Sequence, residues 1–224
     1  MNQINLIKDI IKQKNSKICL AADVETVNDL FNLIEQVGDK ICILKIHYDI
    51  ISDFFLNYYE TSSKLRNYKE KYNFLIWEDS KFGDIGHILL KKINNHIIEW
   101  ADLISIHPIG GLLSVNQIKD IGIILIGELS CHGNLINLEY KNKVVEISNS
   151  CNNIVGIVCQ SKMSNNLLNI TPGISLSNKT DNLGQQYSSP ITKLFSDILV
   201  IGRDIYQSKN PRQKIIEILD VINQ

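Results

Sequence analysis

Acidic and basic side chains alternate in one short segment, Glu78-Asp79-Ser80-Lys81-Phe82-Gly83-Asp84. It directly follows the apolar run 74–77, which has the composition of a buried strand. Asp79 and Lys81 are two residues apart, so in an extended backbone they share one face. Asp84 lies farther on and must reach the same site from a loop. A carboxylate beside an ammonium group keeps the lysine charged and oriented, as a positioned proton donor requires.

The same residues also permit purely structural interpretations. Asp79 and Lys81 could form an ion pair at a strand end, because such pairs are common in folded proteins. Asp84 and Asp23 could each cap a helix, and His47 could be a hydrogen-bonded structural residue. Residue types and spacing alone therefore indicate an enzyme with a reactive lysine and leave its reaction open.

Eight short apolar runs, rich in β-branched residues, recur along the chain between turn residues. Segments with helical periodicity lie between them, for example residues 27–37 and 211–222. Strands that alternate with helices indicate parallel βαβ units, and eight of them in 224 residues fit a closed barrel better than an open doubly wound sheet. The expected strands are residues 18–22, 41–46, 74–77, 103–106, 121–126, 155–158, 168–170 and 197–201.

The whole chain, residues 1–224, is expected to form a single α/β domain, a (β/α)8 TIM barrel with a short N-terminal helix over residues 4–11. No Pro-, Ser- or Gly-rich linker divides it. Polar residues at the C-terminal ends of barrel strands point toward the active-site mouth. Those positions here hold Asp23, Lys45, Asp79, Lys81, His107, Glu128, Ser130 and Arg203.

Charge and composition exclude several classes of function. With 23 basic and 24 acidic residues the formal net charge is −1, which argues against nucleic acid or a membrane surface as the main partner. No run approaches the roughly 18 apolar residues of a membrane span, and the N-terminus lacks the unbroken apolar stretch of a signal peptide. The five cysteines have no C-x-x-C or zinc spacing, which indicates reduced thiols in a cytoplasmic protein.

Five motifs, which occur in the family's order, resemble those of the orotidine 5′-phosphate decarboxylases. The likeness covers residues 17–206. The D-x-K-x-x-D signature alone is weak, because related sugar-phosphate enzymes share it, whereas five ordered matches are specific. The motifs are F-L-I-W-E-D-S-K-F-G-D-I-G at 74–86, L-K-I-H-Y-D-I at 44–50, T-P-G at 171–173, D-N-L-G-Q-Q-Y at 181–187 and I-G-R at 201–203.

The resemblance implies decarboxylation of orotidine 5′-phosphate to UMP and CO2, the last step of de novo pyrimidine biosynthesis, without a metal or organic cofactor. Lys81 would donate the proton to C6 of the pyrimidine as CO2 departs. Asp79 would lie against the substrate carboxylate and, with Asp84, would hold Lys81 charged and oriented. In the family the second Asp of the signature comes from the partner subunit, so Asp84 implies a homodimer with shared sites.

The resemblance also assigns residues that bind the substrate. Asp23 and Lys45 match residues that hydrogen-bond the ribose hydroxyls, and Ser130 matches the residue that reads the pyrimidine edge. Residues 175–182 are interpreted as a lid whose closure over the phosphate would contribute to transition-state stabilisation. The phosphate would be held by Gln185, Tyr187, Gly202 and Arg203, of which the arginine offers a planar fork of donors.

Two positions depart from the family pattern. Ala21 stands where the family usually has Ser, and Ile88 where it usually has a Thr that contacts the ribose across the dimer. Isoleucine offers neither donor nor acceptor, so a ribose contact worth about 1 kcal/mol is expected to be lost. These changes leave an inactive nucleotide-binding protein as one alternative. A metal-dependent barrel enzyme is another, which Lys45 disfavours because those enzymes place a metal-binding carboxylate there.

Overall fold

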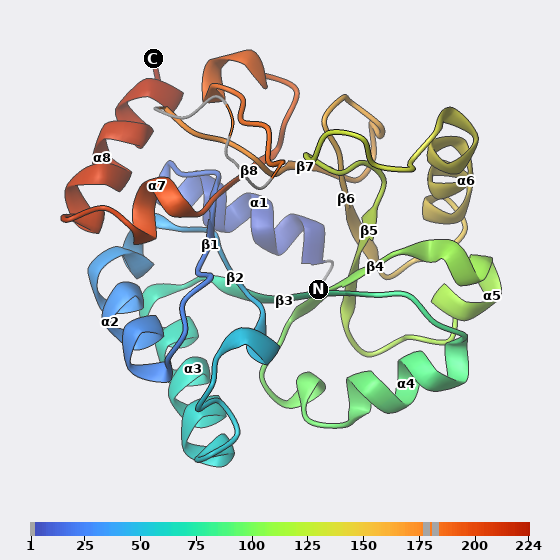
Figure 1. Cartoon of the computed structure of the whole chain (residues 1–224), viewed down its shortest axis with the longest axis horizontal. Helices are drawn as coiled ribbons and strands as arrows, with labels where there is room; N and C mark the ends of the chain where they lie inside the picture. Colours follow the sequence, from blue (N-terminus) through green and yellow to red (C-terminus); the bar gives the residue numbers. More distant parts are fainter. Residues whose placement is uncertain (1–2, 177–179, 181–183) are drawn as a thin grey trace.

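The computed structural model describes residues 3–176, 180 and 184–224. Its eight parallel strands close into one barrel, in which each strand pairs with its neighbours in chain order and β8 pairs with β1 (Figure 1). The expected (β/α)8 barrel is therefore confirmed. The strands are β1 (Ile18–Ala21), β2 (Ile43–Ile46), β3 (Leu75–Phe82), β4 (Leu103–Ile106), β5 (Gly122–Ile126), β6 (Ile154–Val158), β7 (Leu168–Thr171) and β8 (Ile198–Ile201).

The helices surround the barrel, because parallel strands need connections that cross back outside the sheet. The segments with the clearest periodicity, 27–37 and 211–222, are helices over the predicted residues. The α-helices are α1 (Gln3–Lys14), α2 (Val27–Val37), α3 (Tyr58–Tyr72), α4 (Gly86–Asn94), α5 (Gly111–Val115), α6 (Leu138–Ser148), α7 (Arg203–Tyr206) and α8 (Pro211–Ile222), and the 3-10 helices are η1 (Gly38–Lys40), η2 (Tyr48–Ile50), η3 (Ile97–Glu99), η4 (Pro108–Gly110) and η5 (Pro190–Thr192).

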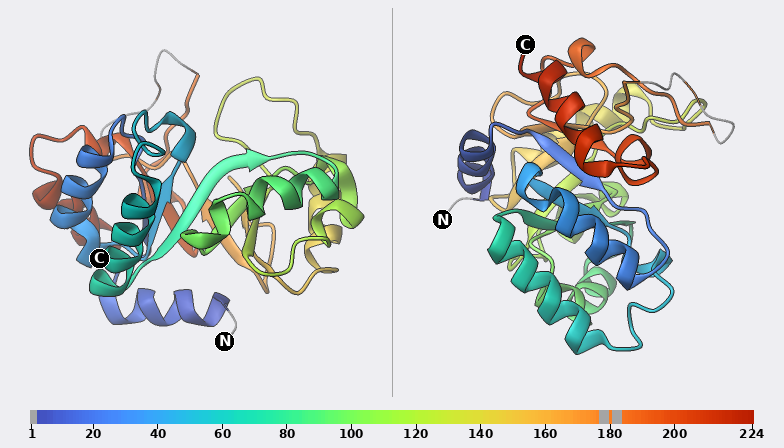
Figure 2. Two further views of the ribbon diagram at one scale, coloured as in Figure 1. Left: turned by 90° about the horizontal axis from the view of Figure 1, so that it is seen from below. Right: turned by 90° about the vertical axis from the view of Figure 1, so that its left-hand side faces the viewer.

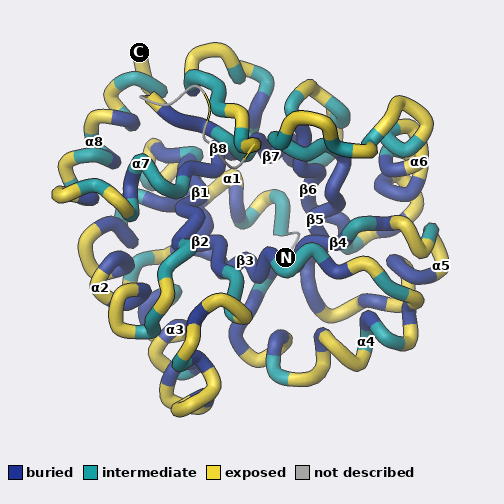
Figure 3. The backbone as a smooth tube through the Cα atoms, viewed as in Figure 1, coloured by how far each residue is buried: buried dark blue, intermediate teal, exposed yellow. Residues whose placement is uncertain are grey.

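Apolar side chains form two packed layers, one inside the barrel and one between the barrel and its helices. The strands are buried, while the outward faces of the helices are exposed (Figure 3). The predicted N-terminal helix, α1, lies across the N-terminal end of the barrel (Figure 2), where Ile7 and Ile10 pack into the inner layer. This helix covers the end of the barrel opposite the mouth at which functional residues gather in this fold.

β3 is longer than the sequence predicted, because it continues past Trp77 to Phe82. Asp79 and Lys81 therefore lie within the strand and do not follow it. Charged residues are rare in buried strands, which is why the apolar run alone predicted an earlier end. The strand continues because its charged side chains have polar partners, and β4 still pairs with it where Phe82 lies opposite Ile106.

Glu78 is fully buried on the outward face of β3, the face that also carries Ile76. Its carboxylate accepts hydrogen bonds from the Ser80 backbone amide, at 3.0 and 3.1 Å, and from the Ser80 hydroxyl. No basic side chain in the described part of the chain forms an ion pair with it. Burial raises the pKa of Glu78 to about 7 despite the Ser80 hydrogen bonds, and the nearby carboxylates of Asp79 and Asp49 add to the rise.

Glu78 should make the stability of the fold pH-dependent. Because its folded pKa of about 7 lies above the ordinary value of 4.5, its protonated form is favoured by folding, and that stabilisation is lost as the pH rises through 7. Relative to a Glu78→Gln chain, which stays neutral, the free energy of unfolding should fall by roughly 2–3 kcal/mol between about pH 5 and pH 8. Denaturant unfolding of both chains across this range measures the difference, and parallel curves would contradict it.

Candidate active site

A cavity of about 280 Å³ lies at the C-terminal ends of the strands. Every residue to which the sequence assigned a catalytic or substrate-binding role contributes to its wall except Asp84, whereas His107 and Glu128, expected at the mouth from their positions at strand ends, do not line it. His47, Trp77 and Cys131, which the sequence did not assign to a site, line it as well. The predicted residues in the wall are Asp23, Lys45, Asp79, Lys81, Ser130, Gln185, Tyr187, Gly202 and Arg203.

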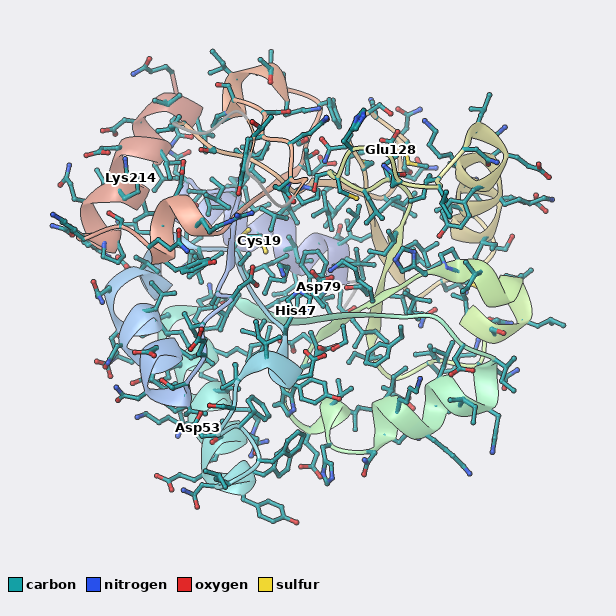
Figure 4. The ribbon with its side chains drawn as sticks, viewed as in Figure 1. Cys19, His47, Asp53, Asp79, Glu128 and Lys214 are labelled. Carbon is teal, nitrogen blue, oxygen red and sulfur yellow. The ribbon has the colours of Figure 1, made fainter. Side chains whose placement is uncertain are left out.

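Asp79 is the centre of a buried cluster of charges. Its Oδ2 atom lies 2.9 Å from Lys45 Nζ on β2 and 2.9 Å from Lys81 Nζ on its own strand. His47, beside which Asp79 lies near the centre of the barrel (Figure 4), places Nε2 3.4 Å from the same oxygen. Lys45 Nζ lies 3.4 Å from Asp23 Oδ1. Acidic and basic groups thus alternate from the end of β1 to β3.

The charges in this cluster stabilise one another. Burial alone would raise the pKa of the Asp79 carboxyl, but Lys45, the hydrogen bond from His47, and Lys81 outweigh it and hold that pKa well below its ordinary value. Burial likewise would lower the pKa of Lys45, and the carboxylates of Asp79 and Asp23 reverse the effect and raise it. The attraction between the opposite charges offsets the cost of taking them out of water. Asp79 is therefore ionised and Lys45 is protonated at neutral pH.

Two neutral side chains orient the other oxygen of Asp79. The Ser105 hydroxyl on β4 donates a hydrogen bond to Asp79 Oδ1 and accepts one from Trp77 Nε1 at 2.9 Å. Both residues are buried. From the sequence, Ser105 is only part of the expected strand 103–106. Its hydroxyl, the one polar side chain in the run Leu-Ile-Ser-Ile, is the signal for a polar contact inside the barrel.

Lys81 reaches Asp79 from an unusual backbone conformation. Its φ angle is +49°, in the left-handed region that residues other than glycine rarely adopt. Its Nζ atom lies 2.9 Å from Asp79 Oδ2 and 3.3 Å from the Asp79 carbonyl oxygen. Such strain persists only where surrounding contacts hold it, and it is concentrated at functional sites.

Asp84 does not join the cluster within its own chain. Its carboxylate accepts hydrogen bonds from Lys92 Nζ at 3.1 Å and from the Ile85 amide at 2.9 Å. The alternative interpretation of Asp84 as a helix cap is wrong, because Ile85 is the N-cap of α4. The expected array of Lys45, Asp79, Lys81 and Asp84 is thus assembled in one chain without its last member, and Asp23 supplies the second carboxylate.

Asp23 is likewise not a helix cap. Thr26 is the N-cap of α2, where its side chain accepts a hydrogen bond from the Asp29 amide. Asp23 instead faces Lys45 in the cavity wall. His47, interpreted from the sequence as structural, contacts Asp79 in the same wall.

The other end of the cavity brings together residues from the connections that follow β5, β7 and β8. Gln185 Nε2 donates a hydrogen bond to Ser130 Oγ at 2.8 Å, and the Arg203 guanidinium lies 5.4 Å from the centre of the Tyr187 ring. At Gly202 the backbone packs so closely on β1 that a Cβ atom would lie 3.3 Å from Ala21. Of the predicted lid, residues 177–179 and 181–182 lie outside the described residues.

Glu128 has a structural role beside this cavity. It accepts hydrogen bonds from the backbone amides of Gln160, at 2.6 Å, and Ser161, at 2.8 Å, and from Lys141 at 2.9 Å. Gln160 Nε2 in turn donates to the Pro172 carbonyl at 3.0 Å. The residues that follow β6 therefore tie the connections after β5, β6 and β7 to one another.

The described residues contain no group of three or more His, Cys, Asp or Glu side chains that could hold a metal ion. None of their helices combines the length and the apolar character of a membrane span.

Comparison with known proteins is consistent with this geometry. Residues 16–218 match the family model described as "Orotidine 5'-phosphate decarboxylase / HUMPS family". The chain is 34% identical over 218 residues to the orotidine 5′-phosphate decarboxylase of Saccharomyces cerevisiae, which covers 88% of this chain and 81% of the yeast protein. The corresponding enzyme of Pichia kudriavzevii is 33% identical, with 90% of this chain and 84% of that protein covered.

A longer protein is also similar. The uridine 5′-monophosphate synthase of Bos taurus is 34% identical over 216 residues, which cover 90% of this chain but only 44% of the bovine protein. The chain thus spans less than half the length of that relative. Because the family model covers most of the chain and the yeast proteins match it over most of their length, the chain belongs to the orotidine 5′-phosphate decarboxylase / HUMPS family.

Proposed function

We propose that the chain catalyses the decarboxylation of orotidine 5′-phosphate to UMP and CO2, the last step of de novo pyrimidine biosynthesis, without a metal or organic cofactor. Relatives that cover most of its length bear the name of this enzyme. The observation that carries the proposal is the contact of Lys81 and Lys45 with one buried carboxylate, Asp79, in the wall of a cavity. A ring carbon placed there meets a proton donor, the Lys81 ammonium group, that cannot turn away without giving up its ion pair with Asp79.

The reaction needs one proton and stabilisation of one developing negative charge. The bond between C6 and the carboxyl carbon breaks, its electron pair stays on C6, and CO2 leaves. Lys81 then transfers a proton from Nζ to C6, and its positive charge stabilises the carbanion before the transfer. Asp79 holds the Lys81 ammonium group in place through their ion pair, and Lys45 keeps Asp79 ionised. These interactions are formed before the substrate arrives, so little reorganisation is needed during the reaction.

The remaining wall residues fit the parts of the nucleotide. Asp23 and Lys45 bind the ribose hydroxyls, next to the reacting carbon. Ser130 reads the pyrimidine edge, and its hydrogen bond with Gln185 connects this position to the phosphate end. The phosphate is bound by Gln185, Tyr187, Arg203 and the backbone at Gly202, and a cation–π contact with the Tyr187 ring supports the Arg203 guanidinium.

The active form is proposed to be a cytoplasmic homodimer in which Asp84 acts in the partner's site. Exposed apolar side chains surround this residue: Ile85 is 63% exposed, Ile109 70% and Leu113 78%. The backbone at Gly110 packs directly against the Asp84 carbonyl, so these side chains and Asp84 belong to one surface. A contiguous apolar surface of this kind is typical of a protein interface. A second copy that covers it would place Asp84 near the neighbouring Lys81.

The proposed reaction can be tested by following loss of orotidine 5′-phosphate absorbance. The wild-type chain should convert the nucleotide at the same rate with and without EDTA, because no step uses a metal. Lys81→Ala should lower kcat by about 10³-fold or more, since it removes both the proton donor and the charge at C6. Lys91→Ala, which removes an exposed lysine on α4, is the matched control and should leave kcat unchanged. Binding of UMP by a wild-type chain without turnover would instead support an inactive nucleotide-binding protein.

The shared site predicts complementation between two inactive chains. Lys81→Ala and Asp84→Ala homodimers should each have little activity. Mixed under conditions in which subunits exchange, they should regain up to about a quarter of the wild-type activity, because half of the dimers are heterodimers and each has one intact site. Exchange is verified with differently tagged chains. If exchange occurs and activity does not return, Asp84 does not act in the partner's site.

A further inference from the structure

The strand that carries Lys81 contains a bulge next to the cavity. β3 and β4 pair at Glu78 with Ile104 and again at Phe82 with Ile106. Between these pairs β3 has three residues and β4 has one, so the ladder is interrupted where Asp79 and Lys81 face the cavity. A bulge of this kind bends a strand, re-aims its side chains and breaks the regular hydrogen bonding of its backbone.

Glu78 binds the middle of this bulge from the opposite face of the strand. Its carboxylate oxygens lie 3.0 and 3.1 Å from the Ser80 amide nitrogen, which donates to both, and the Ser80 hydroxyl donates to one of them as well. The Ser80 amide is partly buried and so has limited access to water as an acceptor, and the interrupted ladder does not regularly supply one. Glu78 therefore provides locally what the regular sheet would otherwise provide.

The burial of Glu78 indicates that this contact matters. The side chain is fully buried, no basic side chain of the described residues pairs with it, and the carboxylates of Asp79 and Asp49 are close enough to disfavour its charge. An acidic group in such surroundings lowers the stability of the fold at neutral pH. An apolar residue would fill the same space without this penalty but could not accept the Ser80 hydrogen bonds.

We propose that Glu78 is a positioning residue: by accepting the Ser80 amide it holds the bulge in β3 and so keeps Lys81, the next residue, in the left-handed conformation that aims its ammonium group at Asp79. Glu78 does not line the cavity and acts only through the backbone between them. Glu78 acts as a hydrogen-bond acceptor, and its charge is not required for this role. A neutral carboxyl or an amide group at the same position has a carbonyl oxygen that can accept the same hydrogen bond from the Ser80 amide. The inference rests on the decarboxylase function proposed above.

The test compares Glu78→Leu, which removes the acceptor, with Glu78→Gln, which keeps it. The leucine chain should lose about 10- to 100-fold in kcat, while KM and the affinity for UMP change less than about three-fold, because a misplaced Lys81 affects the reaction more than binding. The glutamine chain should stay within about three-fold of wild type in all three. If the leucine chain does not fold, Glu78→Met, whose unbranched side chain has a similar length but no strong acceptor, takes its place with the same expectation.

Ile76→Ala is the matched control, since it disturbs the same buried face of β3 two residues earlier without touching the bulge. It should lower the melting temperature and leave kcat unchanged at temperatures where the chain is folded. The inference is overturned if the leucine chain keeps wild-type kcat, if glutamine lowers kcat as much as leucine does, or if the Ile76→Ala chain loses kcat to the same extent. A wild-type chain without decarboxylase activity would refute the proposed function itself, which is a separate outcome.

Discussion

One buried carboxylate, shared by two ammonium groups, determines the arrangement of the site. Asp79 stays ionised inside the barrel because Lys45, His47 and Lys81 contact it, and either lysine would lose its main partner without it. Loss of one member of a buried ion pair typically costs about 3–5 kcal/mol, since the remaining charge is left uncompensated. β2 and β3 must therefore be neighbours in fixed register, which the barrel provides by pairing Lys45 with Trp77.

The two ends of the cavity are built from different parts of the barrel. The charged cluster comes from the C-terminal ends of β1, β2 and β3 with support from Ser105 on β4, whereas the opposite wall comes mainly from the connections that follow β5, β7 and β8. The charged groups are fixed by contacts inside the sheet. The opposite wall is held together by side-chain contacts between loops, such as that of Gln185 with Ser130. The first part is suited to precise placement, and the second can adapt to a ligand.

Patterns local to the sequence predicted the barrel and the strand-end residues of the cavity wall, whereas Gln185, Tyr187 and Gly202 were predicted from the family resemblance. The helices over 27–37 and 211–222 and the alternation of strands follow from periodicity, and Asp79 and Lys81 follow from their spacing at the end of an apolar run. Ser105 and His47 could not be assigned, because their roles depend on which strands become neighbours. The buried position of Glu78 was equally hidden, since a charged residue next to a strand reads as solvent-facing. The position of Asp84 relative to a partner subunit does not follow from the sequence of one chain.

The N-terminal helix α1 closes one end of the barrel and so limits where ligands enter and leave the cavity. Since α1 seals that end with Ile7 and Ile10 and the interior beneath the cavity is filled with side chains, no passage is expected through the barrel axis. In the proposed reaction, CO2 released in the cavity would therefore leave through the C-terminal face of the barrel, where the nucleotide enters. The order in which CO2 and UMP are released would thus depend on what opens this face of the cavity.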